Sequence, residues 1–176
     1  MTKEIWIFAY GSLIWRPGFD YSDRVKARLP GWSRRFWQAS TDHRGVPGAP
    51  GRVVTLVDDD DGICEGVAYC LDGDIDQTLA YLDHREQGGY ERRYIDIELL
   101  TEPATRVNAL VYVGDETNPQ FTGATQMEAL VDTIRQAHGP SGSNRDYLLN
   151  LAEALEREGI EDSHAAAIAE QLSLSV

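Results

Sequence analysis

The chain has 176 residues, of which 42% are apolar and 26% charged, a composition typical of one soluble globular domain with a substantial core. Its net charge of −13 argues against nucleic acid or an anionic membrane surface as a partner, since both require a basic face. No apolar run reaches the roughly 20 residues that span a bilayer, and the N-terminal segment lacks the pattern of a secretory signal. We therefore expect a cytosolic protein that forms a single domain over residues 1–176.

The first apolar run, from Ile5 to Ala9, is short, continuous and rich in aromatic and β-branched residues, which predicts a buried strand over residues 5–10. It ends at Gly11 and Ser12. Because Gly11 has no Cβ, backbone N–H groups there can approach a ligand closely, and Ser12 adds a hydroxyl donor. Such a turn can hold a carboxylate or a developing oxyanion. From these residues alone, an ordinary tight turn is the favoured interpretation.

Further strands are predicted at residues 34–38, 52–57, 63–71, 92–100 and 106–113. The loop of residues 39–51 is long for a plain connection, and loops of this kind are often functional. The acidic run at residues 58–62 looks like a calcium loop, but it lacks the EF-hand spacing and the distal glutamate. We expect a hairpin turn there instead.

Helices are predicted at residues 74–85, from about 125, at 144–158 and at 163–172. Residues 125–128 read as a capping box for the second helix, and Gly159 is a plausible stop for the third. Strands thus occupy the first two thirds of the chain and helices the last third, which predicts an α+β fold.

Cys64 and Cys70 are the only cysteines and fall six residues apart in one predicted strand. A straight strand separates them by roughly 20 Å, which is too far for a disulfide. Neither cysteine belongs to a zinc-binding spacing. We expect two reduced structural thiols.

Arginines gather in two groups along the sequence, which are Arg34, Arg35, Arg44 and Arg52, and then Arg85, Arg92 and Arg93. In so acidic a chain, an anionic substrate would need local positive charge of this kind, because arginine binds carboxylates with two parallel hydrogen bonds. For any single arginine, pairing with a surface Asp or Glu is the favoured alternative.

Residues 8–15 resemble the Tyr-Gly-Ser-Leu signature of the γ-glutamylcyclotransferase-like proteins. Residues 33–45, 50–56 and 81–90 resemble one branch of them, the ChaC-like glutathione-specific γ-glutamylcyclotransferases, and residues 139–142 match more weakly. The blocks follow the family order and cover most of the chain. The resemblance implies a small, mixed, closed or nearly closed β-barrel with flanking α-helices, the helical last third (about residues 125–173) packed on the barrel, and a substrate cavity at one end.

The resemblance also implies the reaction. The α-amine of reduced glutathione attacks its own γ-amide carbonyl, releasing 5-oxoproline and Cys-Gly in a lyase reaction that needs no metal or cofactor. It carries the catalytic glutamate onto Glu86, which can make both proton transfers. Without it, Glu86 reads as a helix-end acid paired with Arg85 or Arg92. The expected substrate-binding residues are Tyr10, Gly11, Ser12, Leu13, Ile14, Trp15, Arg35 and Tyr112.

Several alternatives stay open at this point. The turn can hold either the α-carboxylate or the oxyanion. Tyr10 and Trp15 can equally be core residues, and a strand tyrosine such as Tyr112 is usually one. Ala9 and Gln87 stand where relatives often have Gly and Lys, and the missing Lys can weaken binding of the glycine carboxylate. The competing functions are cyclisation of other γ-glutamyl amino acids or amines, and a non-catalytic regulatory protein linked to cation transport. The oligomeric state is left open.

Overall fold

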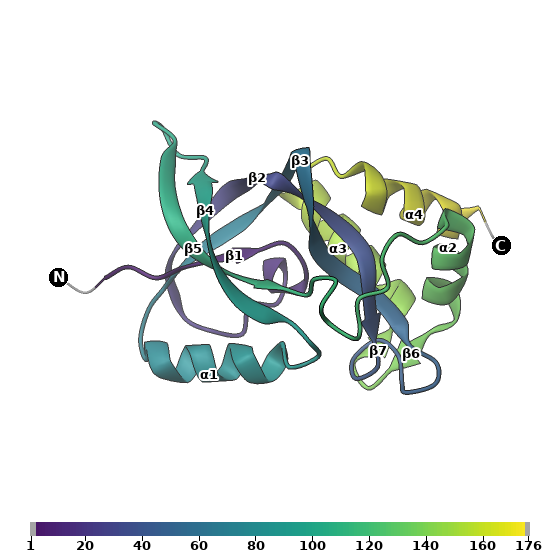
Figure 1. Cartoon of the computed structure of the whole chain (residues 1–176). Helices are drawn as coiled ribbons and strands as arrows, with labels where there is room; N and C mark the ends of the chain where they lie inside the picture. Colours follow the sequence, from purple (N-terminus) through teal and green to yellow (C-terminus); the bar gives the residue numbers. More distant parts are fainter. Residues whose placement is uncertain (1–2, 175–176) are drawn as a thin grey trace. The chain divides into compact units, whose positions relative to one another are not determined.

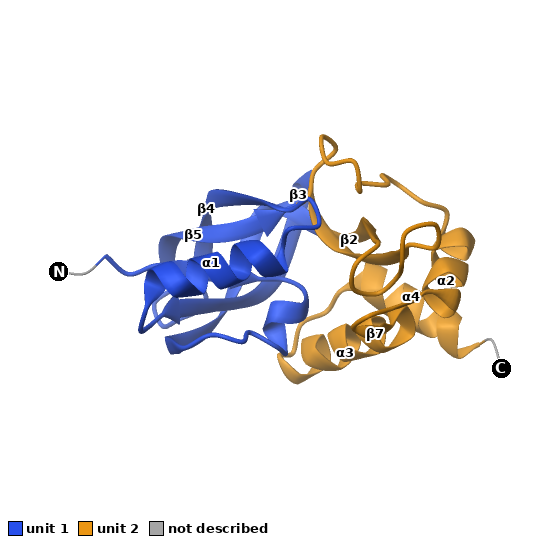
Figure 2. Ribbon diagram, turned by 90° about the horizontal axis from the view of Figure 1, so that it is seen from below, with its two compact units in different colours: residues 1–33, 58–113 blue, residues 34–57, 114–176 orange. Residues whose placement is uncertain are grey.

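The computed structural model describes residues 3–174, and the chain forms two compact units (Figures 1 and 2). Unit 1 contains the described residues up to 33 together with residues 58–113, and unit 2 contains residues 34–57 and the described residues from 114 onward. The single domain over residues 1–176, with its helical last third packed on the barrel, stays a prediction.

Five strands close into a barrel in the order β1, β3, β2, β4, β5. Their bounds are Trp6–Ala9 for β1, Tyr21–Ser40 for β2, Gly51–Leu71 for β3, Glu91–Leu99 for β4 and Thr105–Val113 for β5. Strand β1 pairs antiparallel with β3 and parallel with β5, so the barrel is mixed. The predicted α+β class and the closed mixed barrel are confirmed.

Strand β1 is the centre of the core in unit 1. All four of its residues are buried, as the continuous apolar run predicted. Trp6 lies opposite Cys70 on β3, and Ala9 lies opposite Val67. Both faces of β1 are therefore covered, and the turn that follows it starts from a fixed point.

Strands β2 and β3 are longer than predicted, and the expected hairpin turn at residues 58–62 is wrong. Those residues lie inside β3, and Gly62 has no positive φ. Asp59 instead accepts a hydrogen bond from the Ser33 hydroxyl at 2.5 Å. Because Asp58 and Asp60 point to solvent while Asp59 is half-buried, the run alternates like any strand with one exposed face.

Four helices complete the fold: α1 at Ile75–Arg85, α2 at Met127–Gln136, α3 at Asn144–Arg157 and α4 at Ser163–Ser173. Asp74 caps α1 by accepting a hydrogen bond from the Gln77 N–H. The predicted capping box of α2 is wrong, because Gln126 is the N-cap and makes no side-chain cap bond. The Thr125 hydroxyl is engaged elsewhere, accepting from Arg52 at 2.9 Å and donating to the Gly123 carbonyl.

Unit 2 packs α2, α3 and α4 against one another, together with the end of β2 and the start of β3. Asn144 is fully buried, and its side-chain amide accepts a hydrogen bond from the Arg52 N–H and donates one to the Arg52 carbonyl. Strands β6 (His138–Gly139) and β7 (Gly142–Ser143) form a short hairpin. A Cβ on Gly139 would lie 2.3 Å from the His43 carbonyl oxygen, so this hairpin docks on the 41–50 loop with backbone against backbone.

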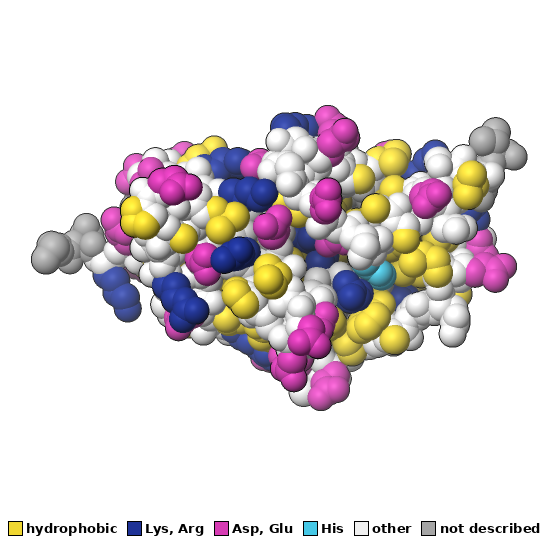
Figure 3. All heavy atoms as spheres, turned by 90° about the horizontal axis from the view of Figure 1, so that it is seen from above, with side chains coloured by type: hydrophobic (Ala, Val, Ile, Leu, Met, Phe, Trp, Pro, Cys, Tyr) yellow, Lys and Arg dark blue, Asp and Glu magenta, His cyan; other side chains and the backbone are white. Residues whose placement is uncertain are grey.

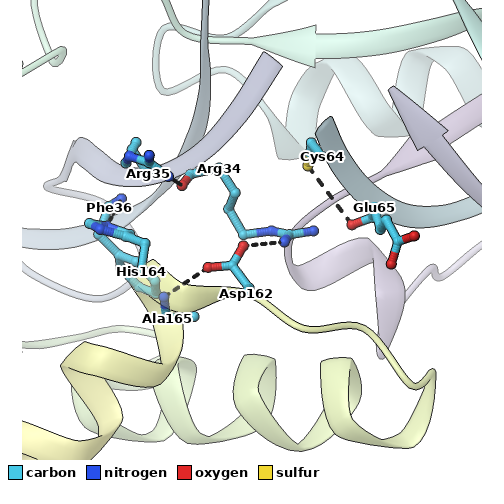
Figure 4. Close-up of polar contacts among 8 residues, drawn as sticks. All are labelled: Arg34, Arg35, Phe36, Cys64, Glu65, Asp162, His164 and Ala165. Atoms are coloured by element: carbon cyan, nitrogen blue, oxygen red, sulfur yellow. Dashed lines mark hydrogen bonds and ion pairs between the residues drawn. The ribbon is translucent and has the colours of Figure 1, made fainter. Parts of the chain in front are cut away.

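A buried ion pair anchors the start of α4 to β2 (Figure 4). Arg34, which is 2% exposed, donates to Asp162 at 2.6 Å. The other carboxylate oxygen of Asp162 accepts from the Ala165 N–H at 2.9 Å and so caps the helix. One carboxylate therefore neutralises a buried guanidinium and begins a helix.

His164 makes a second link between α4 and β2, since its Nε2 accepts the Phe36 N–H at 3.0 Å. Burial lowers the pKa of His164 from 6.5 to about 4, with the charges of Arg35 and Arg34 adding to the effect and that of Asp162 opposing it. The imidazole is therefore neutral at pH 7, and the accepted hydrogen bond places its proton on Nδ1.

Because the pKa of His164 is lowered in the folded protein, we expect the free energy of unfolding to fall in mild acid. The unfolded chain protonates His164 near pH 6.5 and the folded chain only near pH 4, so its contribution is complete above pH 6.5 and is lost as the pH falls toward 4. We expect this group to account for about 1–2 kcal/mol, allowing for its partial exposure. Urea unfolding of wild type and His164→Gln at pH 7.0 and 4.5 measures it. An identical pH dependence in both proteins would contradict the assignment.

Charges of both signs are mixed on the face shown in Figure 3. Several ion pairs join neighbouring strands or lie along one helix, such as Arg28 with Glu98 and Arg157 with Glu153. Cys64 and Cys70 are both buried free thiols, as predicted. Within residues 3–174, none of the helices is long and apolar enough to cross a bilayer.

Candidate active site

The Tyr-Gly-Ser-Leu turn (residues 10–13) leaves β1 and enters a short 3₁₀ helix, η1, at Ser12–Ile14. The Ile14 N–H donates to the Gly11 carbonyl, and the Arg16 N–H to the Ser12 carbonyl. The N–H groups of Gly11, Ser12 and Leu13 come before the first backbone hydrogen bond of this helix, so they have no acceptor within it. Three successive N–H groups of this kind at a helix start form a ready site for an anion or an oxyanion.

Tyrosine hydroxyls bond this turn to the barrel. The Tyr69 hydroxyl lies 2.9 Å from the Leu13 carbonyl and 3.1 Å from that of Ile14. The Tyr10 hydroxyl donates to the Tyr112 carbonyl at 2.5 Å. All three tyrosyl side chains are buried, so the hydroxyl bonds fix the turn to the barrel on both sides.

Glu86 lies at the C-cap of α1, where the chain turns toward β4. Its N–H donates to the Leu82 carbonyl at 2.9 Å, and its own carbonyl accepts from the Tyr90 N–H at 3.3 Å. The residue is half-buried, between the exposed His84 and Gln87. Backbone bonds on both sides thus hold Glu86 at the end of a rigid helix, which is a suitable place for a group that transfers protons.

Arg85, the residue before Glu86, joins this helix end to the Tyr-Gly-Ser-Leu turn. Its Nη2 donates to the Ser12 hydroxyl at 3.0 Å. Its Nη1 contacts the Arg16 carbonyl at 2.6 Å and the Pro17 carbonyl at 3.2 Å. The pairing of Arg85 with Glu86 that we considered from the sequence is not among these contacts. Arg85 instead brings the two predicted halves of the site together.

A second link between α1 and the barrel was missed by sequence reasoning. Asp83 Oδ1 accepts from the Tyr112 hydroxyl at 2.7 Å and from Arg92 Nε at 2.6 Å, and Asp83 Oδ2 accepts from Arg92 Nη2. Tyr112 and Arg92 lie opposite each other on β5 and β4. No sequence signal links these three residues to one another, because only the placement of α1 beside those strands brings them together.

The protonation states in this trio follow from the contacts. Hydrogen bonding to Arg92 is the main cause that lowers the pKa of Asp83. Burial, followed by the hydrogen bond to Asp83, raises the pKa of Tyr112 well above its usual range. Tyr112 is therefore a neutral donor and Asp83 a carboxylate at neutral pH. The trio orients α1 and offers no spare proton acceptor near pH 7.

The remaining predicted site residues have these positions. Leu13 and Ile14 have buried side chains, and Trp15, at the end of η1, is half-buried. Arg35 belongs to unit 2, where it donates to the Arg34 carbonyl at 2.7 Å and lies 5.9 Å from the Trp37 ring. All the other predicted site residues belong to unit 1. The role of Arg35 in substrate binding stays a prediction.

Comparisons with known proteins agree with this fold. The chain is similar to a crystal structure of a γ-glutamyl cyclotransferase specific to glutathione from yeast, with a TM-score of 0.92 and 31% identity over 98% of this chain and 97% of that one. The barrel and its helices therefore define a γ-glutamylcyclotransferase-like fold.

Comparison of sequences supports the same family. Human glutathione-specific γ-glutamylcyclotransferase 1 is 43% identical over 171 residues, which cover 94% of this chain and 77% of that protein. The glutathione-specific γ-glutamylcyclotransferase of Saccharomyces cerevisiae is 33% identical, over 98% of this chain and 99% of that protein. A family model described as ChaC-like protein matches residues 5–174. The chain belongs to the ChaC-like family.

Proposed function

We propose that this chain is a γ-glutamylcyclotransferase that converts reduced glutathione into 5-oxoproline and Cys-Gly, with Glu86 as its general acid and base. The observation that carries the proposal is the link from the Glu86 end of α1 to the Tyr-Gly-Ser-Leu turn, made by the 3.0 Å bond from Arg85 to Ser12. A proton-transfer group and a row of N–H donors are thereby tied to one another within unit 1.

The reaction itself sets the requirements. The α-nitrogen forms a bond to the γ-carbonyl carbon, and the bond from that carbon to the cysteinyl nitrogen breaks. Two protons pass from the α-ammonium to the leaving nitrogen, and no water is consumed. Because attack is intramolecular, the site needs to fold the substrate, move protons and stabilise the oxyanion. A lyase of this type has no step that requires an added cofactor.

Glu86 can make both proton transfers in sequence. As a carboxylate it accepts a proton from the α-ammonium, which frees the attacking lone pair. As the resulting acid it donates that proton to the leaving nitrogen as the tetrahedral intermediate collapses, and the carboxylate then takes the second proton from the new ring nitrogen and passes it to the released amine. Its half-buried position at a helix end supports this role, because such a carboxylate is accessible to a substrate yet held by the backbone on either side.

The Tyr-Gly-Ser-Leu turn supplies the anionic end of the site. The N–H groups of Gly11, Ser12 and Leu13 suit either the α-carboxylate of the γ-glutamyl group or the oxyanion that forms at its carbonyl. Fixed donors of this kind lose little order when the substrate binds, since Tyr69 and Tyr10 already hold the turn. The proposal includes a cytosolic location, where reduced thiols such as Cys64 and Cys70 persist.

A substrate panel tests the specificity in this proposal. We expect 5-oxoproline from reduced glutathione at a kcat/KM at least about 10-fold above that for γ-glutamyl amino acids, a difference of about 1.4 kcal/mol in transition-state binding. Oxidised glutathione and a γ-glutamyl amine complete the panel. Preference for a γ-glutamyl amino acid or amine would show that the substrate is not glutathione, while the assigned cyclisation reaction would stand. Binding of glutathione without turnover by the folded protein would contradict the enzymatic assignment.

A further inference from the structure

The Arg85 guanidinium makes four hydrogen bonds, and its partners are carbonyls and hydroxyls rather than carboxylates. Its guanidinium contacts the Ser12 hydroxyl, the carbonyls of Arg16 and Pro17, and the Tyr81 hydroxyl at 3.1 Å. Arg92, seven residues later, instead forms a bidentate ion pair with the Asp83 carboxylate. A guanidinium that donates to carbonyls and hydroxyls fixes the position of the backbone that carries them, and it does not form an ion pair.

The segment that Arg85 holds is packed closely onto the same face of α1. Tyr81 and Arg85 lie one helical turn apart. A Cβ on Gly18 would lie 2.4 Å from the Tyr81 hydroxyl oxygen, and Gly18 has a φ of +74°. The chain from Ser12 to Gly18 therefore lies against Tyr81 and Arg85, and only glycine fits at its last position.

Resting on the proposed function, we propose that Arg85 is a positioning residue for catalysis. Through its bonds to Ser12, Arg16 and Pro17, it holds the N–H groups of the Tyr-Gly-Ser-Leu turn at a fixed separation from Glu86. Its side chain acts through the turn and does not bind a substrate carboxylate. This assignment departs from both alternatives that the sequence offered for these arginines, which were binding of a substrate carboxylate and pairing with a surface Asp or Glu.

The expected effect follows from the geometry that cyclisation needs. Reacting groups misplaced by about 1 Å can lose roughly 100-fold in rate even when the change lies away from the chemistry. Arg85→Met keeps an unbranched side chain that replaces the aliphatic stem, and it removes every donor. We therefore expect kcat to fall about 100-fold with KM changed less than about threefold, because binding groups remain while their alignment is lost. Arg85→Lys, which keeps the charge and part of the donor set, should recover part of kcat.

The experiment measures kcat and KM for reduced glutathione in wild type, Arg85→Met, Arg85→Lys and Arg157→Met. Arg157 is a matched control because it loses the same charge from the exposed surface of α3. A double-mutant cycle of Arg85→Met with Ser12→Ala should be strongly non-additive, because each substitution alone already removes the hydrogen bond between Arg85 and Ser12. A fall in kcat of less than twofold in Arg85→Met, or a rise in KM alone, overturns the inference. If Arg85→Met does not fold, Arg85→Lys and its own cycle with Ser12→Ala decide, and a kcat within twofold of wild type or a rise in KM alone again overturns the inference.

Hydrogen exchange separates this inference from the proposed function. The hydrogen-bonded amides of Ile14 and Arg16 should exchange at least about 10-fold faster in Arg85→Met than in wild type, whether or not glutathione is turned over. Unchanged exchange overturns the positioning role. A folded wild type that forms no 5-oxoproline overturns the proposed function, and the catalytic part of this inference with it, while the exchange result still reports on the contact itself.

Discussion

Glu86→Gln should leave the fold unchanged and lower kcat for glutathione cyclisation by about 1,000-fold, within the range of 10²–10⁴ that a general acid–base contributes. The amide has nearly the same shape as the carboxylate but cannot accept the ammonium proton. The backbone bonds of Glu86 to Leu82 and Tyr90 do not depend on its side chain, so the end of α1 should persist. Kinetics with reduced glutathione, together with thermal unfolding, provide the measurement.

Glu91→Gln is the matched control for that substitution. Glu91 is an exposed carboxylate at the start of β4, five residues from Glu86, and the same acid-to-amide change there should leave kcat within about twofold. A folded Glu86→Gln protein that keeps a tenth or more of wild-type kcat would rule out Glu86 as the proton-transfer group.

Asp162→Ala should cost about 3–5 kcal/mol of unfolding free energy, because it removes the carboxylate that neutralises the buried Arg34. The same change removes the N-cap of α4. For a chain of this length, the loss corresponds to a fall in Tm of about 10 °C. Urea unfolding at pH 7 gives the free energy, and a thermal scan gives Tm.

Two further variants divide that loss into its parts. Asp162→Asn keeps a cap acceptor but not the charge, so it isolates the ion pair. Glu161→Ala changes the exposed neighbour and should shift stability by less than about 0.5 kcal/mol. A loss below about 1 kcal/mol in Asp162→Ala would show that Arg34 is adequately solvated without Asp162, contrary to its 2% exposure.

The sequence was most informative where local pattern and tertiary burial agree. The apolar run before Tyr10 predicted β1, and the helical spacing before Glu86 predicted α1, both within one residue or two of their bounds. The family signatures then located the candidate site on the turn after β1 and on the end of α1. These features are local, so neighbouring residues were enough to reveal them.

The errors arose where tertiary pairing overrides local chemistry. A strand was predicted only at residues 34–38, yet the long strand β2 begins at Tyr21 and contains Pro30 and Gly31. The run of four aspartates and Gly62 read as a hairpin, yet it lies within β3, where Ser33 bonds to Asp59. Strand pairing satisfies the backbone of these segments, and local propensity alone does not show it.

The framework around the site was also hidden from the sequence. Arg85 precedes Glu86 in a recognised block, so its importance had a signal, but its partners are about 70 residues earlier in the chain. Tyr69 had no such signal, and Asp83 lies in the same block as Arg85 but its role could not be predicted, because the partners of both residues come from other elements. Contacts of this kind depend on how the barrel closes and on where α1 lies beside it.

Product analysis in ¹⁸O-labelled water tests the central claim most directly. Intramolecular cyclisation of reduced glutathione consumes no water, so purified protein should release 5-oxoproline and Cys-Gly in equal amounts, with no ¹⁸O in either and no glutamate. Glutamate carrying one ¹⁸O would show that water, rather than the α-amine, attacks the γ-carbonyl. That result, or the absence of any product from the folded protein, would contradict the assignment as a cyclotransferase acting on glutathione.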